Sequence, residues 1–464
     1  MTDWYPDLSG SNAPRYLALA QCIEDDIASG RLKPGDRLPA QRPLAQKLGL
    51  DFTTVARGYT EARRRGIIAS QVGSGTFVTK TGGQGRLRSP SQGEQRNPLP
   101  DHSMNLPPET ADPDLIAQMQ DSLERLKTDL VPLMRYQSFD TSVIDLEAGA
   151  HWLGGSGLFP ERKHILIAPG AQAALAAILA QLAQRGDTIA CEAITYPGIR
   201  SLCAQMGLRL QGIATDVDGV VPEAFEDTCR KDQPKALYLN PTLQNPTCCT
   251  IPQERRVQLA KIADRFQVPI IEDDPYSQLD PKAPPPLATT APELTWHISS
   301  LSKCVSAGLR IAYIVPPDKQ AGWQLSRAMR TSHVMPAPFT VALATDWIQK
   351  GIATRLRDFV RTESMARQAS AAKALQGQRY SANPNGFHLW LELVHGWTGA
   401  ALANQSPLRL LGPASAEAFC VDAAAPAAVR LCLGGPTSRG EIANALDALA
   451  GLLGASPEEA SAFM

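Results

Sequence analysis

The chain lacks several features that would place it in a special structural class. Its nine cysteines show no Cys-x-x-Cys spacing and its seven histidines form no cluster with ligand spacing, so neither a disulfide framework nor a metal site is predicted. The most apolar stretch, residues 165–183, is interrupted by proline, glycine and glutamine, which favours a buried helix over a membrane span. The N-terminus shows no secretory signal pattern. These absences predict a cytoplasmic protein with reduced thiols and no membrane segment.

Length and charge divide the chain into unequal parts. A chain of 464 residues exceeds one ordinary core, and its hydrophobic fraction of 44% and charged fraction of 20% are those of a folded protein. Residues 13–80 contain eleven basic and six acidic side chains, a charge of +5, whereas the whole chain carries -1. A basic module of residues 1–80 beside an acidic remainder predicts an anionic partner for the module only.

Residues 81–103 predict a flexible linker, because glycine, proline and serine are frequent there and apolar residues are few. The remaining residues, 104–464, form the predicted large domain. No internal repeat is found in the chain.

The first module carries a helix-turn-helix pattern. Apolar residues at helical spacing predict one helix before Gly30 and a short second helix before Gly49. Asp51 or Thr53 can cap a third helix that turns Val55 inward. This arrangement leaves three polar side chains outward near the N-terminal end of that helix, at Thr53, Thr54 and Arg57. Such a position suits a helix that reads DNA, although an exposed polar face without DNA contacts is the alternative.

A β-hairpin with a glycine-rich tip is predicted over residues 67–78 and would form the wing of a winged helix. Together with residues 28–39 and 53–55, the hairpin resembles the GntR regulators. The resemblance implies that DNA contacts come from Arg42, Thr53, Thr54, Arg57 and Gly75. The family often has Ser-Arg where this chain has Asp51-Phe52, so one DNA contact common in the family is missing here.

From residue 104 onward, short apolar runs alternate with helical stretches. Strands are predicted at 165–168, 188–191, 236–239 and 268–272, separated by segments long enough for crossover helices. This alternation predicts an α/β domain with a mainly parallel sheet. Ligands bind such sheets beyond the carboxyl ends of the strands, and polar candidate residues lie at those positions.

One motif combines a nucleophile with groups suited to a phosphate. Ser300-Leu301-Ser302-Lys303, followed by Arg310, offers an amine able to form a Schiff base beside hydroxyls and a guanidinium. The turn at residues 170–172 opens a helix, whose N-terminal amides can also hold a phosphate. Taken singly, Lys303 would be an ordinary surface lysine.

Four further residues follow predicted strands. Tyr196 could stack on an aromatic ring or belong to the core. Asn245 offers an amide to a phenolic oxygen, and Tyr276 a hydroxyl. Asp273 could keep a pyridine nitrogen protonated or could cap a helix. The order of these motifs along the chain resembles the fold-type I aminotransferases, which bind pyridoxal 5'-phosphate.

The resemblance implies a role for each candidate. Lys303 would form the Schiff base, Asp273 would face the pyridine nitrogen, and Tyr196 would stack on the ring. Asn245 and Tyr276 would contact the phenolic oxygen. The phosphate would be surrounded by Gly170, Ala171, Gln172, Ser300, Ser302 and Arg310.

Two residues carry implications beyond the cofactor. Tyr136 matches a tyrosine that reaches the phosphate of the partner subunit, which implies a homodimer. Arg430, expected just after a strand, matches the arginine that grips a substrate carboxylate, and a surface arginine at a strand end is the alternative. The chain departs from the aminotransferase pattern at Cys248, where glycine is usual, and at Ala307, where proline is usual.

A winged helix-turn-helix joined through a linker to an aminotransferase-like domain resembles the MocR subgroup of the GntR regulators. The resemblance implies a head-to-tail homodimer that binds operator DNA and senses an amine or amino acid through pyridoxal phosphate. Two other interpretations stay open at this point. The protein could be an active aminotransferase with an accessory module, or it could sense pyridoxal phosphate itself.

Overall fold

The structure is a computed structural model that describes residues 4–8, 14–33, 35–65, 67–71, 75–78, 100–137, 142–421 and 424–457. The chain divides into two compact units, Met1–Leu99 and Pro100–Met464. Most of the predicted linker, residues 81–99, lies outside the described residues. Residues 100–103, which the sequence assigned to the same linker, begin the larger unit.

The smaller unit packs its helices and a small antiparallel sheet around one apolar core. Its helices are α1 (Arg15–Ala28), α2 (Gln41–Leu48) and α3 (Phe52–Arg64). Its described strands form an antiparallel sheet in the order β1-β3-β2, made of β1 (Arg37–Leu38), β2 (Ile68–Gln71) and β3 (Gly75–Val78). The wing tip at 72–74 lies outside the described ranges. The predicted winged helix-turn-helix is confirmed.

Local chemistry sets the orientation of α3. Gly49, with φ +63°, ends α2 in the left-handed region that glycine adopts freely. The carboxylate of Asp51 accepts a hydrogen bond from the Thr53 amide at 2.8 Å and caps α3. Val55 is fully buried, and Gly58 permits a close helix contact, because a Cβ there would lie 2.7 Å from Leu19 Cδ2. The inward face of α3 therefore packs on α1.

Within the described part of the larger unit, a seven-stranded sheet has the order β4-β12-β11-β10-β9-β5-β6. Its neighbours pair in parallel except where β12 runs antiparallel to β4 and β11. The strands are β4 (Leu166–Ala168), β5 (Thr188–Glu192), β6 (Arg209–Ile213), β9 (Ala236–Leu239), β10 (Ile270–Asp273), β11 (Thr295–Ser300) and β12 (Ala312–Val315). The predicted mainly parallel α/β domain is confirmed.

Helices cover both faces of this sheet. One apolar core joins the sheet to α7 (Ala171–Leu182), α8 (Pro197–Met206) and α11 (Lys319–His333). The other face packs against α9 (Pro222–Asp232), α10 (Gln253–Phe266), α6 (Val143–Gly154) and α12 (Pro338–Gln349). Successive side chains of a strand point to opposite faces of the sheet, and both faces are buried. The strands are therefore continuous apolar runs in the sequence.

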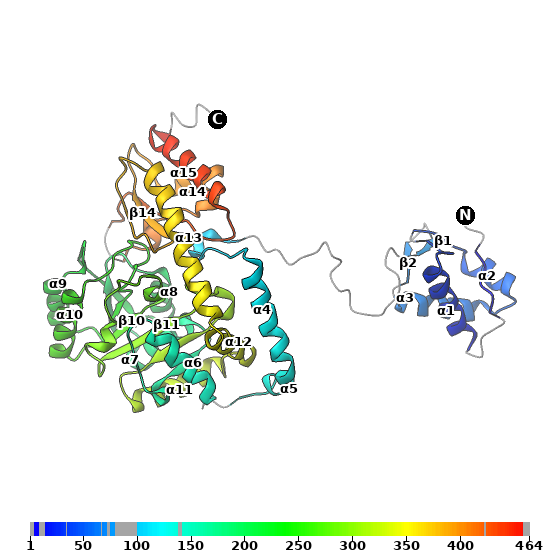
Figure 1. The fold of residues 1–464 in the computed structure, drawn as a ribbon, viewed down its shortest axis with the longest axis horizontal. Helices are drawn as coiled ribbons and strands as arrows, with labels where there is room; N and C mark the ends of the chain where they lie inside the picture. Colours follow the sequence, from blue (N-terminus) through cyan, green and yellow to red (C-terminus); the bar gives the residue numbers. More distant parts are fainter. Residues whose placement is uncertain are drawn as a thin grey trace. The chain divides into compact units, whose positions relative to one another are not determined.

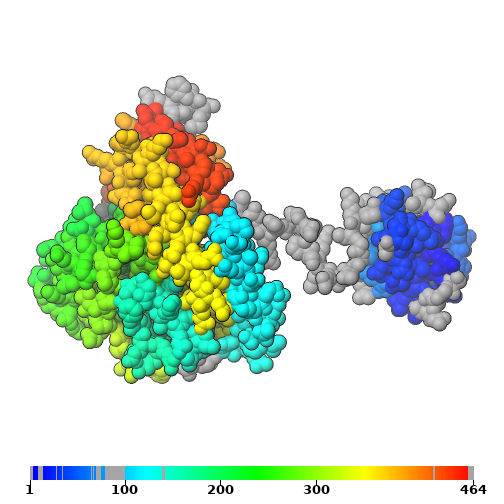
Figure 2. Space-filling model, in the orientation of Figure 1, coloured from blue at the N-terminus to red at the C-terminus, as the bar shows by residue number. Residues whose placement is uncertain are grey.

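A smaller lobe of the same unit contains a four-stranded antiparallel sheet, ordered β13-β14-β16-β15 among the described residues. Its elements are β13 (Tyr380–Ala382), β14 (His388–Glu392), β15 (Ala414–Ser415), β16 (Ala428–Cys432), α14 (Gly399–Ala403) and α15 (Arg439–Leu453). The long helix α13 (Ile352–Ala374) runs from α12 into this lobe (Figure 1). It lies beside α4 (Pro113–Leu126), which is followed by α5 (Leu130–Leu133) (Figure 2).

The two-stranded hairpin of β7 (Thr215–Asp216) and β8 (Gly219–Val220) completes the described strands of this unit. None of the helices that the structure describes is both long enough and apolar enough to cross a membrane.

Candidate functional site

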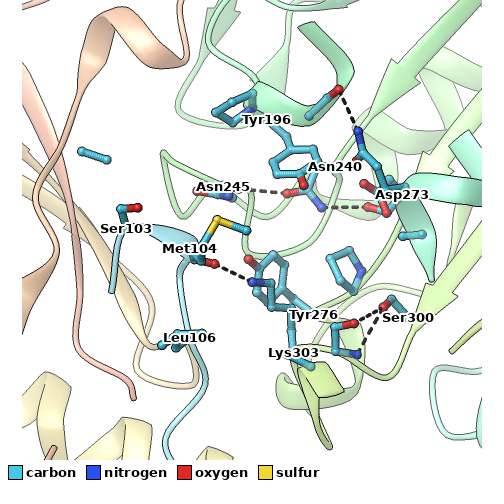
Figure 3. Close-up of a pocket in the computed structure, with 18 of the residues that line it drawn as sticks. Ser103, Met104, Leu106, Tyr196, Asn240, Asn245, Asp273, Tyr276, Ser300 and Lys303 are labelled. Atoms are coloured by element: carbon cyan, nitrogen blue, oxygen red, sulfur yellow. Dashed lines mark hydrogen bonds between the residues drawn. The ribbon is translucent and has the colours of Figure 1, made fainter. Parts of the chain in front are cut away.

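The carboxyl ends of the parallel strands meet at one edge of the large sheet and supply the candidate site. Asp273 ends β10, Ser300 ends β11, and Asn240 follows β9. They border a cavity of about 640 Å³ (Figure 3). The predicted residues in its wall are Ala171, Gln172, Tyr196, Asn245, Asp273, Tyr276, Ser300, Ser302, Lys303, Arg310 and Arg430.

One region of the cavity is suited to an anion. Gly170 precedes α7 with φ +93°, and a Cβ on it would lie 2.6 Å from Arg310 Nη2, so the absence of a side chain lets the guanidinium approach the turn. The Ser300 hydroxyl donates to Ser302 Oγ at 3.1 Å and accepts from the Ser302 amide at 3.2 Å. Gln172, also on the first turn of α7, donates to the Gly198 carbonyl at 3.2 Å. The helix N-terminus and the guanidinium both attract negative charge.

Asp273 is a buried carboxylate with one unused oxygen. Its Oδ2 accepts a hydrogen bond from the Tyr238 hydroxyl at 2.9 Å, whereas Oδ1 is buried and has no hydrogen-bond partner among the described residues. Burial raises the pKa of Asp273 to about 6. An unsatisfied buried acceptor is unfavourable, so a donor placed at Oδ1 would be bound strongly.

The aromatic residues and Asn245 lie around this carboxylate. The Tyr276 hydroxyl accepts a hydrogen bond from Asn105 Nδ2 at 2.9 Å and keeps its own hydrogen to donate. Asn245 Oδ1 lies 3.4 Å from Arg430 Nη1, which donates to it. Burial raises the pKa of both Tyr196 and Tyr276, so their hydroxyls stay protonated at neutral pH.

Lys303 directs its amine into the cavity. The Nζ atom donates to the Met104 carbonyl at 2.9 Å (Figure 3). It also donates to the Asn105 carbonyl at 2.7 Å. Burial, followed by the charge of Arg430, lowers the pKa of Lys303 to about 8. A fraction of the amine is therefore unprotonated and nucleophilic near neutral pH.

Arg430 supplies a buried cation from the smaller lobe. It lies inside β16, paired opposite Trp390 and Ala414, and the expectation that it follows a strand is wrong. Its side chain donates to the Ser103 carbonyl, and its guanidinium carbon lies 5.6 Å from the Phe419 ring centroid. Burial lowers its pKa. Alternation along the strand directs this residue out of the lobe's own core, because Val429 and Leu431 occupy that core.

Sequence reasoning missed several residues of the cavity wall. Asn240 donates through Nδ2 to the Asp273 carbonyl at 2.7 Å and accepts from the Asn245 amide at 2.9 Å. The buried carboxyl of Glu192 accepts from the Asn240 amide at 3.0 Å. The two Asn-Pro pairs after one strand were the signal that could have identified Asn240. Ser103, Met104 and Phe419 also line the cavity and gave no such signal.

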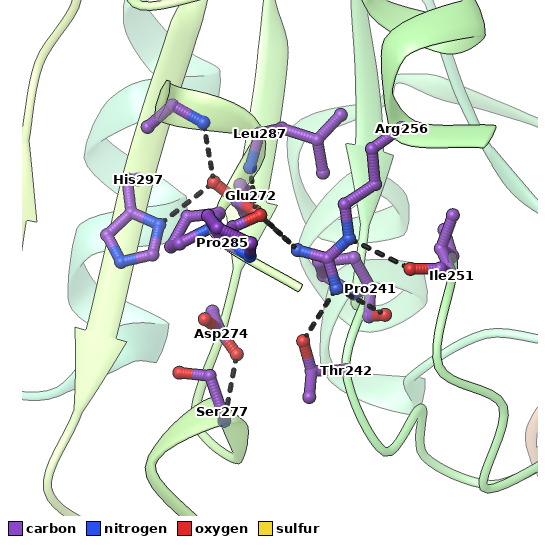
Figure 4. A network of polar contacts seen from close by, with 12 residues as sticks. Pro241, Thr242, Ile251, Arg256, Glu272, Asp274, Ser277, Pro285, Leu287 and His297 are labelled. Atoms are coloured by element: carbon purple, nitrogen blue, oxygen red, sulfur yellow. Dashed lines mark hydrogen bonds and ion pairs between the residues drawn. The ribbon is translucent and has the colours of Figure 1, made fainter. Parts of the chain in front are cut away.

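A buried polar network surrounds Glu272, the residue before Asp273 in β10 (Figure 4). Glu272 and His297 form a hydrogen bond of 2.9 Å between Oε2 and Nδ1, and Glu272 also accepts from the Leu287 amide at 2.7 Å. Arg256, 3.7 Å from Glu272, donates to the Ile251 and Pro241 carbonyls. Burial acts to raise the pKa of Glu272, but the contacts with His297, Arg256 and the Leu287 amide together hold that pKa below its usual range. The network fixes the loop that carries Asn245.

Tyr136 lies beyond α5, outside the cavity wall, and its side chain is 87% exposed. The prediction that it reaches a partner's phosphate concerns a second chain and stays a prediction.

The candidate DNA-binding residues of the smaller unit lie on its surface. Arg42, Thr53 and Arg57 are exposed, and Thr54 is partly exposed. The Arg57 guanidinium lies 4.4 Å from the Tyr16 ring centroid, and the Thr53 hydroxyl bonds to Asp51. Gly75 has φ +119° and adjoins the Arg37 guanidinium. The outward orientation follows the sequence pattern, and the DNA contacts themselves stay a prediction.

Comparison with protein families agrees with these two units. Residues 15–78 match the family model of bacterial regulatory proteins of the gntR family. Residues 105–449 match the model of aminotransferases of class I and II.

Two curated relatives align with most of this chain. The uncharacterized HTH-type transcriptional regulator YdeF of Bacillus subtilis (strain 168) is 29% identical over 460 residues, covering 97% of this chain and 96% of the relative. The probable rhizopine catabolism regulatory protein MocR of Rhizobium meliloti is 26% identical over 382 residues, covering 75% of this chain and 74% of the relative.

Among solved structures, the fold resembles LysN, an alpha-aminoadipate aminotransferase of Thermus thermophilus, with a TM-score of 0.65 and 22% identity. The match covers 75% of this chain and 90% of LysN. That protein was solved with N-(5'-phosphopyridoxyl)-L-leucine. The chain belongs to the aminotransferase class I and II family through residues 105–449, and its fusion of this domain to a GntR winged helix makes it a member of the MocR subgroup of GntR regulators.

Proposed function

We propose that the protein is a transcriptional regulator that binds operator DNA through its winged helix and responds to an amino acid through pyridoxal 5'-phosphate held in the larger unit. The observation that carries this proposal is the single cavity that gathers Lys303, Asp273 and Arg430 in a chain that also has a winged helix. Relatives with regulatory names support it. A regulator of this kind acts where the DNA is, in the cytoplasm.

The cavity residues fit pyridoxal phosphate. Asp273 Oδ1, buried without a partner in the described part of the chain, would accept from the pyridine nitrogen, and Tyr196 would stack on the ring. Asn245 and Tyr276 would contact the phenolic oxygen. Lys303 would hold the aldehyde carbon as a Schiff base. The phosphate would be bound by Gly170, Ala171, Gln172, Ser300, Ser302 and Arg310.

The bound cofactor would supply an electrophilic carbon to which primary amines add reversibly. The chain's own residues would select among those amines. Arg430 is a buried guanidinium, suited to a carboxylate. Leu106, Ala414, Ala418 and Phe419 form an apolar wall near it. These features favour an amino acid with an uncharged side chain as the effector.

Regulation would act on a dimer. Tyr136, exposed in one chain, would complete the phosphate site of a partner subunit in a head-to-tail homodimer. Two winged helices would then engage two operator half-sites, and effector binding would change their affinity through a shift between conformations. Arg42, Thr53, Thr54, Arg57 and Gly75 are the proposed DNA contacts.

A residual aminotransferase activity is the second candidate function. The specific observation in its favour is that Lys303, Asp273 and Arg430 line one cavity, as turnover requires. Measuring keto acid formation from amino acids with pyridoxal phosphate and a keto acid acceptor decides between them. Turnover of about one per second or faster, without sequence-specific DNA binding, would favour the enzyme.

The regulator is tested by titrating the full-length protein with pyridoxal phosphate, recording its visible absorption, and then screening single amino acids for a change in that spectrum. The same protein, with and without the cofactor and with each responding amino acid, is then bound to DNA sites selected in vitro. A spectral response together with altered DNA affinity is expected. If DNA affinity responds to pyridoxal phosphate and to no amino acid, the cofactor itself is the signal.

A further inference from the structure

The segment that enters the larger unit from its N-terminal side forms a tight turn over the cavity. We call residues Asp101–Asn105 the strap. It contains the 3-10 turn His102–Met104, stabilised by the Asp101 carboxylate, which accepts from the Ser103 amide at 3.0 Å and from the Ser103 hydroxyl at 2.6 Å. Asn105 ends the turn in the left-handed region, with φ 51°. The strap is therefore a short ordered element.

The strap accepts hydrogen bonds from Lys303 and Arg430, the two cationic side chains of the proposed ligand site. Figure 3 shows Ser103, Met104 and Lys303 beside the cavity. The carbonyls of Met104 and Asn105 accept hydrogen bonds from Lys303 Nζ, and the Ser103 carbonyl accepts from Arg430. The aldehyde carbon of the cofactor, bonded to Lys303, and a ligand carboxylate bound at Arg430 would need the same nitrogen atoms. The strap and a ligand thus compete for one pair of cations.

The two ends of the strap are held unequally. Beyond its C-terminal end, Pro107 accepts from the Gly435 amide at 3.0 Å, and the chain passes so close to Gly434 that a Cβ there would lie 1.7 Å from the Leu106 carbonyl oxygen. Toward its N-terminal end, His102 is buried, but its Nδ1 atom has no partner within the described ranges. Because an unpaired buried nitrogen is unfavourable, release is easier at the N-terminal end.

The competition favours a charged ligand. A carboxylate bonds a guanidinium through two charge-assisted hydrogen bonds, whereas the Ser103 carbonyl is a neutral acceptor. A cofactor bonded to Lys303 removes two of the carbonyl contacts of the strap, and a carboxylate bound at Arg430 removes the third. The Met104 side chain, 61% exposed, adds little burial to hold the strap in place.

We infer that the strap is the element that reports ligand binding: the cofactor carbon bonded to Lys303 and an amino acid carboxylate bound at Arg430 take the donors that hold the strap, which displaces it and frees residues 100–106 at the start of the larger unit. The inference rests on the proposed function for the identity of the ligand. The competition itself rests on contacts within this chain and can be tested without cofactor or DNA.

The test is hydrogen–deuterium exchange of full-length protein, followed by mass spectrometry of peptides that cover residues 100–106. Arg430→Met and Lys303→Met each remove the donors but keep an unbranched side chain. Each should speed exchange of the Met104 and Asn105 amides roughly tenfold, because hydrogen bonds to charged donors are lost. Those amides donate to the carbonyls of Asp101 and His102 at 3.1 and 3.3 Å within the turn.

Arg310→Met is the matched control, since it removes a guanidinium that lies in the same cavity wall but beside the Gly170 turn rather than the strap. Exchange over residues 188–192 of β5 reports whether each variant keeps its fold. Unchanged exchange over 100–106 in both test variants, or an equal increase in Arg310→Met, overturns the inference.

A second arm adds pyridoxal phosphate to the unmodified protein and to Lys303→Met. Faster strap exchange is expected in the unmodified protein only. If the visible absorption appears while strap exchange stays the same, the inferred competition between strap and cofactor for Lys303 is contradicted, and the cofactor assignment stands. If no absorption forms, the proposed cofactor is wrong, and the two methionine variants still decide whether Lys303 and Arg430 hold the strap.

Discussion

The two candidate sites of this protein are built in opposite ways. In the larger unit, residues between Gly170 and Arg430 come together in a cavity, and Asp273 is 5% exposed. In the smaller unit, the candidate residues fall between Arg42 and Gly75 and lie on the surface. The first site depends on the whole fold, whereas the second depends on one helix and a hairpin.

The difference sets the size of the effect that a single substitution can have. A buried charged group with few partners is strongly coupled to its ligand, because water cannot replace a lost contact. An exposed phosphate contact is one of several and is screened by salt. All-or-none effects are therefore expected in the cavity and graded effects on the winged helix.

The largest effect is expected for Lys303→Ala. The substitution removes the amine that would bind the cofactor covalently, so the visible absorption of protein incubated with pyridoxal phosphate should vanish. Lys319→Ala, an exposed lysine at the start of α11, serves as the control and should leave the spectrum unchanged. A band that survives in Lys303→Ala would assign the cofactor to another residue.

A smaller loss is expected for Asp273→Asn. The amide keeps the shape but removes the buried negative partner of a pyridine nitrogen, so affinity for pyridoxal phosphate should fall on the order of 100-fold by equilibrium titration. Asp274→Asn, at a neighbouring buried carboxylate outside the cavity wall, provides the matched comparison. Equal losses in both variants would show that the effect is structural.

The rate at which the visible absorption appears should rise with pH. Below the pKa of about 8 the Lys303 amine is protonated and cannot attack an aldehyde, and above it the amine is free. The initial rate should therefore increase roughly tenfold between pH 7 and pH 9 and then level off. Stopped-flow absorbance measures this, and a rate that stays flat or falls over that range would contradict the lowered pKa.

The smallest effect is expected at the surface. Arg57→Ala should weaken binding to an in vitro selected DNA site severalfold and reduce the slope of log affinity against log salt by about one unit, since one phosphate contact is lost. Arg63→Ala, at the C-terminal end of the same helix, should change neither quantity. If Arg63 had the larger effect, the N-terminal end of α3 would not be the part that meets DNA.

The sequence predicted most of the strand-end chemistry, because residues at the carboxyl ends of parallel strands converge in any such sheet. Asp273, Ser300 and Lys303 were identified in this way, and the structure places them in one cavity. The winged helix was predictable for a different reason, since its helix caps and glycine turns are local signals.

The remaining features depend on tertiary contacts that no local pattern encodes. The composition of residues 100–103 predicts a linker, yet the Ser103 carbonyl is held by Arg430, more than three hundred residues away. Arg430 was expected after a strand, because the residues around it do not show where the strand ends. In the structure it lies within the strand, with Trp390 opposite it on one neighbouring strand and Ala414 on the other. Asn240 and Glu192 contribute to the site through hydrogen bonds to residues that lie on or after other strands.

Gly58 bears on which positions of α3 can be substituted. Packing of α3 on α1 is set by Gly58 and by buried Val55 and Tyr59, none of which faces outward. The outward positions 53, 54 and 57 can therefore be substituted without disturbing the core. Under the proposed function, substitutions at these three positions would change the DNA sequence that the helix reads and would leave the proposed ligand site of the larger unit unchanged.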